Sequence, residues 1–189
     1  MCRRYTLFTD KELSELKDII EQISKDTQRS KMKAGEIFPT DVVPVLVPEK
    51  KKSVAHLFTW GFPSFHGKRV IINARSETVH EKPMFRSSME KRRCVIPSTG
   101  FYEWDSEKKK LLLNLPDSPL LYMAAIYNQF EGENRFVILT TASNKSVSDI
   151  HGRMPVVLTK DEMEDWLLNN ETVDKILFGD HPDLIKKTA

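Results

Sequence analysis

The chain has 189 residues, of which 40% are hydrophobic and 30% charged, a composition typical of one globular domain with a buried core. Its 29 basic and 27 acidic residues leave a net charge of +2, so any binding of anions has to come from local clusters of cations. Two cysteines are too few for a disulfide framework, no apolar run reaches transmembrane length, and the N-terminus lacks the layout of a secretory signal. We therefore expect a cytoplasmic protein with a single domain over residues 1–189.

The first predicted element is an amphipathic helix over residues 10–25, with Thr9 and Glu12 as its capping box. Short apolar runs separated by turn residues then predict strands at 42–47, 54–60, 69–74, 93–97, 100–104, 110–115, 121–127 and 135–141. Hairpin signals stand at PDSP (116–119) and EGEN (131–134), and Thr159 with Glu162 predicts the start of a second helix that runs through Trp166 and Leu168. Many strands with few helices between them predict an α+β fold, built on a curved, mainly antiparallel sheet or barrel-like core with a few flanking helices.

The opening stretch MCRRY places a cysteine directly behind the initiator methionine. If Met1 is removed, Cys2 carries a thiol and a free α-amine on neighbouring carbons. Such a 1,2-aminothiol condenses with an aldehyde, because the amine forms an imine and the thiol then closes a five-membered thiazolidine ring. Both groups are partly available near neutral pH, since their reference pKa values are about 8 and about 8.5. The alternative is that Met1 stays and Cys2 is an ordinary second residue.

Three further segments carry more polar groups than a core requires: INARSET (72–78), GFYEWD (100–105) and HGRMPVV (151–157). Glu103 lies among aromatic residues, where a carboxyl group is a candidate for acid–base work, although an edge-strand glutamate in water is the alternative. His151 is a candidate proton shuttle or a solvated loop residue. Asn73 suits a carbonyl or hydroxyl group and Arg75 suits a phosphate, or they form a turn and a surface ion pair.

The remaining histidines have no metal-ligand spacing among themselves or with Cys94, so we expect no metal and no cofactor. Cys94 precedes apolar residues and is expected to be buried and inert.

Taken in order, MC-x-RY, NARSET, C-x-IP-x-x-GFYEW and HGRMPV resemble the SOS response-associated peptidase (SRAP) family, whose members process abasic sites and cross-link to DNA. FPT (38–40) and WGF (60–62) look like two further blocks, so the resemblance covers residues 2 to about 158. It implies an SRAP-like fold and a cross-linking, lyase-like activity in the DNA damage response. In that activity Cys2, freed of Met1, forms a thiazolidine with the ring-opened abasic sugar of single-stranded DNA.

The resemblance also implies roles for individual residues. Glu103 would be the acid–base catalyst, His151 would assist proton transfer, and Asn73 would orient the amine or the sugar oxygens. The residues implied in DNA binding are Arg4 and Arg75 on phosphates, Trp60 and Trp104 lining or supporting the site, and Pro39 in a wedge against a base. The implied partner is single-stranded DNA with abasic sites, bound near the nucleoid by a monomer that needs no membrane and no metal.

One residue departs from the family pattern, because Arg3 stands where the family commonly has glycine. Arg3 either adds a phosphate contact or crowds the sugar. Two other functions stay open. One is a cysteine peptidase with Cys2 as nucleophile and His151 as base, acting on its own N-terminal residue alone or on other peptides as well. The other is a non-catalytic module that binds single-stranded DNA.

Overall fold

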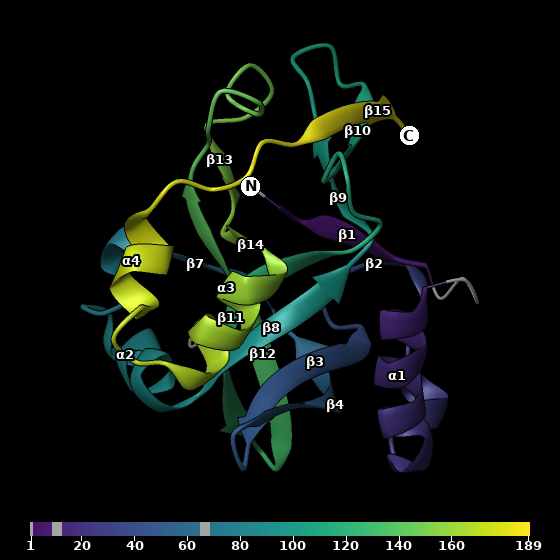
Figure 1. The fold of residues 1–189 in the computed structure, drawn as a ribbon, viewed down its shortest axis with the longest axis vertical. Coiled ribbons are helices and arrows are strands. Elements are labelled where there is room, and N and C mark those ends of the chain that lie inside the picture. Colours follow the sequence, from purple (N-terminus) through teal and green to yellow (C-terminus); the bar gives the residue numbers. More distant parts are fainter. Residues whose placement is uncertain (1, 9–12, 65–68) are drawn as a thin grey trace.

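A computed structural model describes residues 2–8, 13–64 and 69–189, and its central element is a closed β-barrel (Figure 1). β12 pairs with both β4 and β11, which closes a ring in the order β12–β4–β3–β8–β11. The barrel strands are β3 (Val42–Glu49), β4 (Lys52–Trp60), β8 (Arg93–Ser98), β11 (Leu121–Phe130) and β12 (Glu133–Ala142). Only the contact between β12 and β4 is parallel within this ring.

The barrel strands are apolar on both faces because both faces are covered. Side chains alternate along a strand, so Val43 and Val45 belong to one buried cluster and Leu46 to another. The first cluster fills the barrel and includes Trp60 and Phe136 from neighbouring strands. The second cluster packs the outer face against the helices, which explains why runs such as VVPVLV do not alternate with polar residues.

Within the described part of the chain, four α-helices surround the barrel, with α1 beside β4 and α3 across β8 and β11 (Figure 1). Their bounds are α1 (Ser14–Gln22), α2 (Pro83–Lys91), α3 (Lys160–Leu168) and α4 (Val173–Phe178), and the 3-10 turns are Ile23–Lys25, Arg29–Lys31 and Ser76–Thr78. The predicted capping box of the second helix is confirmed, because Thr159 and Glu162 bond reciprocally at the start of α3. The capping box predicted at Thr9 and Glu12 lies outside the described residues.

A second, antiparallel sheet lies against one end of the barrel, in the order β15–β10–β9–β1–β2. Its strands are β1 (Arg4–Leu7), β2 (Gly35–Ile37), β9 (Gly100–Trp104), β10 (Lys110–Asn114) and β15 (Ile185–Thr188). The chain crosses from β8 of the barrel to β9 at Gly100, where φ is +150°. A Cβ there would lie 2.7 Å from the Asn114 side chain and 2.9 Å from the Leu113 carbonyl oxygen, so the crossing requires glycine.

Five short strands of the described residues remain. They are β5 (Phe62–Pro63), β6 (Val70–Ile71), β7 (Asn73–Arg75), β13 (Arg153–Pro155) and β14 (Val157–Leu158). β7, β13 and β14 pair with barrel strands, and β5 and β6 form a separate two-stranded sheet. β7 runs parallel to β12 and pairs Arg75 with Thr140, while β13 pairs its Pro155 with the same Thr140 from the other side. Two segments far apart in sequence therefore meet at one end of β12.

The predicted fold class is confirmed, since mainly antiparallel strands form a barrel-like core with few helices. Two local predictions need correction. Residues 116–119 do not form a hairpin, because β10 and β11 belong to different sheets. The hairpin predicted at 131–134 is confirmed, since a turn at Glu131 and Gly132, both with positive φ, joins β11 to β12. The single strand predicted at 69–74 is divided between β6 and β7 at Ile72, whose carbonyl accepts hydrogen bonds from the Trp60 indole and the Ile138 amide.

Candidate active site

The candidate site lies where β1 and β9 of the sheet meet β7 and β13 of the barrel. Six residues line a cavity of about 430 Å³ there: Arg3, Arg75, Glu103, Trp104, His151 and Arg153. We call it the central cavity. Four of the nine residues predicted for the site, Arg75, Glu103, Trp104 and His151, are thus brought together from three separate segments.

Cys2 is fully buried beside this cavity. The Asn73 side chain donates a hydrogen bond from Nδ2 to the Cys2 carbonyl oxygen over 2.9 Å, which ties β7 to the start of the chain. The other amide atom, Asn73 Oδ1, is buried and accepts no hydrogen bond from the described residues. Burial raises the pKa of the Cys2 thiol well above its usual value, and the negative charge of Glu103 raises it further. The thiol is therefore protonated at neutral pH, and Glu103 lies close enough to influence it.

Glu103 occupies the middle of the five-stranded sheet, since β9 pairs with β10 on one side and β1 on the other. Its side chain is only 5% exposed. An edge-strand glutamate in water is thereby ruled out. Alternation along β9 places Glu103 on the same face as the buried Phe101, as predicted, and Tyr102 and Trp104 on the opposite face.

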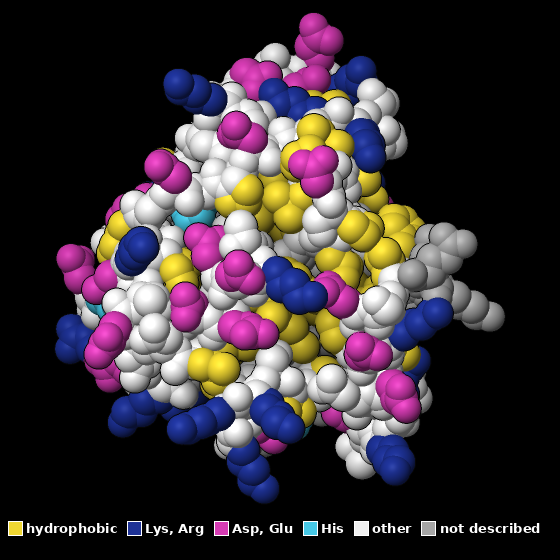
Figure 2. Space-filling view, viewed as in Figure 1, with side chains coloured by type: hydrophobic (Ala, Val, Ile, Leu, Met, Phe, Trp, Pro, Cys, Tyr) yellow, Lys and Arg dark blue, Asp and Glu magenta, His cyan; other side chains and the backbone are white. Residues whose placement is uncertain are grey.

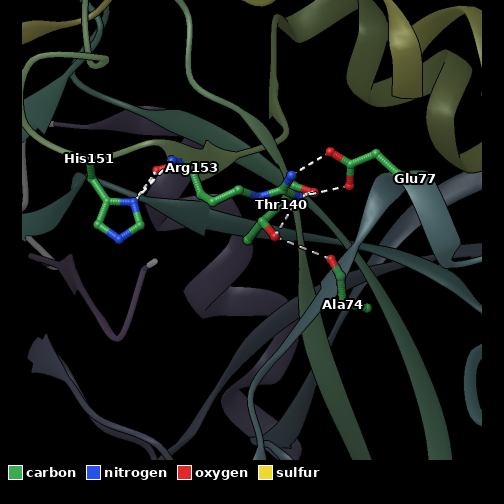
Figure 3. A network of polar contacts seen from close by, with 5 residues as sticks. All are labelled: Ala74, Glu77, Thr140, His151 and Arg153. Atoms are coloured by element: carbon green, nitrogen blue, oxygen red, sulfur yellow. Dashed lines mark hydrogen bonds and ion pairs between the residues drawn. The ribbon is translucent and has the colours of Figure 1, made fainter.

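His151 is oriented by the backbone of the strand that follows it. Its Nδ1 lies 2.9 Å from the Arg153 amide nitrogen and 3.2 Å from the Arg153 carbonyl oxygen. Figure 3 shows Nε2 on the side of the ring turned away from Arg153. The contacts of Nδ1 with the Arg153 backbone thus orient the ring in the cavity that His151 lines.

Arg153 is a site residue to which the sequence interpretation gave no role, although it lies in the HGRMPV block. Its guanidinium forms a bidentate ion pair with Glu77 and donates to the Thr140 carbonyl oxygen over 2.5 Å (Figure 3). The pair holds the pKa of Glu77 below its usual value. The spacing of two residues from His151 along β13 was the signal that could have identified Arg153.

Arg3 and Arg75 carry the other two guanidinium groups of the central cavity. Both side chains are exposed, and neither forms an ion pair or a side-chain hydrogen bond with another residue of the described ranges. Among the described residues, the cavity therefore offers two cations that form no ion pair, which suits an anionic ligand.

The other predicted residues lie beside or beneath the cavity. The Arg4 guanidinium lies between the rings of Phe38 and Trp104, at 4.6 and 5.3 Å from their centroids, and pairs with Glu36 at 3.2 Å. Pro39 follows Phe38, which is 41% exposed, and forms a turn closed by a 3.1 Å bond from the Asp41 amide to the Phe38 carbonyl. These residues form an aromatic and cationic surface next to the central cavity.

Trp60 has no exposed surface, because it packs in the barrel against Tyr5 and Phe136. It therefore supports the site from below: its Nε1 donates to the Ile72 carbonyl, one residue before Asn73. Cys94 is buried in the same cluster, and burial raises the pKa of its thiol, as expected for an inert cysteine.

Two observations concern cofactors and membranes. Within residues 2–8, 13–64 and 69–189, no three His, Cys, Asp or Glu residues are grouped so as to hold a metal ion. No helix in this part of the chain combines the length and apolarity needed to cross a membrane.

Comparison with known proteins connects this site to a family. The family model described as SOS response associated peptidase (SRAP) matches residues 1–182. The chain belongs to the SRAP family. The resemblance in the motifs is thereby confirmed over nearly the whole chain, including the residues of the central cavity.

The SRAP relatives include the abasic site processing protein YoqW of Bacillus subtilis, 34% identical over 88% of this chain and 80% of its own length. The abasic site processing protein YedK of Escherichia coli is 27% identical over 88% of this chain and 79% of its own length. A solved protein from Bacteroides thetaiotaomicron is 24% identical, with a TM-score of 0.76 over 99% of this chain and 91% of that one, and supports the fold.

Proposed function

We propose that this chain processes abasic sites in single-stranded DNA by forming a thiazolidine cross-link through Cys2 after removal of Met1. The names of the SRAP relatives support abasic-site processing, and the site supports the choice of chemistry. The observation that carries the proposal is the hydrogen bond from Asn73 to the Cys2 carbonyl. It fixes residue 2 next to the cavity that contains Glu103, His151 and the guanidinium groups.

The reaction would proceed in two steps. The Cys2 amine attacks the aldehyde of the ring-opened sugar, and loss of one water gives an imine. The Cys2 sulfur then bonds to the imine carbon while the thiol proton leaves and the nitrogen gains a proton. The sum is one C–N bond, one C–S bond and one water released, so no redox partner is needed.

The proposed roles follow from where each group lies. Glu103 beside Cys2 would move protons during sugar opening and water loss, since a nearly buried carboxyl group at a reacting atom is suited to acid–base work. His151, which lines the same cavity, would assist proton transfer to the opening sugar. Arg3 and Arg75 would face the phosphates, and the surface of Arg4, Phe38, Pro39 and Trp104 would receive neighbouring bases.

The cysteine peptidase alternative is disfavoured by the state of the thiol. A nucleophilic cysteine needs a lowered pKa, usually from a nearby cation. Here burial, followed by Glu103, raises the pKa of the Cys2 thiol by more than the positive charge of the terminal amine lowers it. Amine attack on an aldehyde does not need a thiolate at the start, so the environment favours the aminothiol reaction.

Intact mass spectrometry of the product tests the proposal. Protein lacking Met1, mixed with single-stranded DNA containing one abasic site, should give the summed mass of protein and DNA less one water, without any reductant. Cys2→Ala should give a stable adduct only after borohydride, and its mass should be two hydrogens above the summed mass less one water, because an imine that cannot close to a ring persists only when it is reduced to an amine. A wild-type adduct that also requires borohydride would show that no thiazolidine forms.

A further inference from the structure

A second cavity of about 510 Å³ lies next to the central cavity and has no role in the function proposed above. It is formed by β6, β7 and the start of α2. Arg75 lines both cavities, and Asn73, which bonds to Cys2, lines this one. We call it the side cavity. The two cavities therefore adjoin at Arg75.

The walls of the side cavity are largely apolar. Phe85 is 5% exposed, and Ile71 and Met84 are partly buried hydrophobic residues packed on the outer cluster of the barrel. Lys82 and Arg75 add two exposed cations, and neither forms a side-chain hydrogen bond or ion pair within the described part of the chain. Apolar surfaces with cations beside them are the combination that binds a nucleotide, because the base contacts the walls and the phosphate meets the cations.

We propose that the side cavity binds the base of the nucleotide next to the abasic site, with Arg75 on the phosphate that joins the two nucleotides. The inference rests on the proposed function and extends it to the choice of DNA. An abasic nucleotide has no base to occupy a cavity of its own. Its neighbour has one, and a single guanidinium that lines both cavities is suited to the single phosphate between them.

Affinity should therefore depend on a base that takes no part in the reaction. The test measures fluorescence anisotropy of single-stranded oligonucleotides carrying a stable tetrahydrofuran abasic analogue, which binds but cannot cross-link. Two further oligonucleotides replace the base on the 5′ or the 3′ side with a second tetrahydrofuran. With wild-type protein, removal of the base on one of these sides should weaken binding about 5-fold or more, the loss expected for one base contact.

Met84→Ala removes apolar wall from the side cavity without a change in charge. This substitution should weaken binding of the oligonucleotide that has a single tetrahydrofuran and keeps both neighbouring bases. Removal of the neighbouring base on which wild-type affinity depends should then reduce the affinity of the variant little further. Met84→Leu should restore the dependence on that base. Met32→Ala is the matched control, because Met32 is also a partly buried methionine packed on the outer cluster but does not line the cavity.

Two results would overturn the inference. In the first, neither base removal lowers the affinity of wild-type protein. In the second, a base removal lowers the affinity of Met84→Ala by the same factor as that of wild type. Circular dichroism melting checks that Met84→Ala folds, and Met84→Gln, which keeps the length of the side chain, gives a second measurement if it does not. Cross-linking of a true abasic site by wild type is measured in parallel. If the cross-link forms but the coupling is absent, only the side-cavity assignment fails.

Discussion

Arg3 stands where the motif resemblance predicts glycine, and Arg3→Gly tests what it does. Its side chain is exposed, lies before β1 and lines the central cavity with Arg75 and Arg153. Because Glu77 already pairs with Arg153, Arg3 supplies one of two guanidinium groups in the cavity that are not neutralised. We predict that Arg3 contacts one phosphate of the bound strand and that glycine, the usual family residue, removes that contact without unfolding the protein.

The magnitude follows from counterion release. Each phosphate contact on a single strand contributes about 0.7 to the slope of log affinity against log salt, so Arg3→Gly should lower the slope by about 0.7. If wild type and variant bind equally at about 1 M salt, the same slope gives the variant an affinity about 4-fold lower at about 0.15 M salt and about 8-fold lower at about 0.05 M. The assay is a salt titration of anisotropy with the tetrahydrofuran oligonucleotide.

Lys51→Gly is the control for net charge. It removes one cation from an exposed turn between β3 and β4, where φ is +64° and glycine is readily accommodated. Its slope should match that of wild type. If Arg3→Gly keeps the wild-type slope, or if Lys51→Gly loses as much, the placement of Arg3 on a phosphate is refuted.

Four other changes follow from the site and the fold. Glu103→Gln should slow cross-linking yet speed alkylation of Cys2 in protein lacking Met1, because it removes a negative charge that raises the pKa of the thiol. Alkylation is followed by mass spectrometry, and slower alkylation than in wild type would contradict this prediction. His151→Ala should slow cross-linking about 100-fold with unchanged affinity for the tetrahydrofuran oligonucleotide, and an unchanged rate would remove His151 from the mechanism. The thiols of Cys2 and Cys94 both stay protonated in the folded protein but ionise near pH 8.5 in the unfolded chain. The free energy of unfolding should therefore fall above that pH, by about 1.4 kcal/mol per pH unit for each thiol. Urea titrations at rising pH should show Cys94→Ala losing half of this dependence, and a full dependence in that variant would mean that Cys94 does not contribute. Gly100→Ala should destabilise the fold by more than about 2 kcal/mol in the same titrations, since its Cβ would overlap β10, and a near-neutral result would show that the crossing can adjust.

The barrel was predictable from sequence because its strands are long, apolar and separated by turn residues. The same reasoning missed the elements that carry no such pattern. Every residue of β15 is exposed, so its pairing with β10 leaves no hydrophobic signature. α2 begins at Pro83 and has only one pair of buried apolar residues, Phe85 and Met89, at helical spacing. Tertiary packing, not local periodicity, determines both elements.

The site was predictable to the extent that its residues lie in recognisable blocks. The motifs identified Cys2, Asn73, Glu103 and His151, and the structure brings Asn73 to Cys2 and places Glu103 with His151 in one cavity. The motifs did not show how deeply each side chain is buried. Trp60 was expected near DNA but lies inside the barrel, because alternation along β4 directs it inward.

The sequence also did not show which arginines already have interaction partners within the protein. Arg4 is engaged by two aromatic rings and Glu36, and Arg153 by Glu77, whereas Arg75 and Arg3 remain open to an anion among the described residues. A sequence lists arginines without their partners. Only the three-dimensional arrangement distinguishes those already paired from those available to a phosphate.

The central claim is that Cys2, once Met1 is removed, bonds covalently to an abasic site. The most direct measurement is a denaturing gel of wild type lacking Met1, wild type with Met1 retained and Cys2→Ala, each mixed with single-stranded DNA that carries an abasic site or an intact base. We expect a slower band that survives denaturation only for wild type lacking Met1 on abasic DNA. No such band from that protein, or an equal band when Met1 is retained, would contradict the claim.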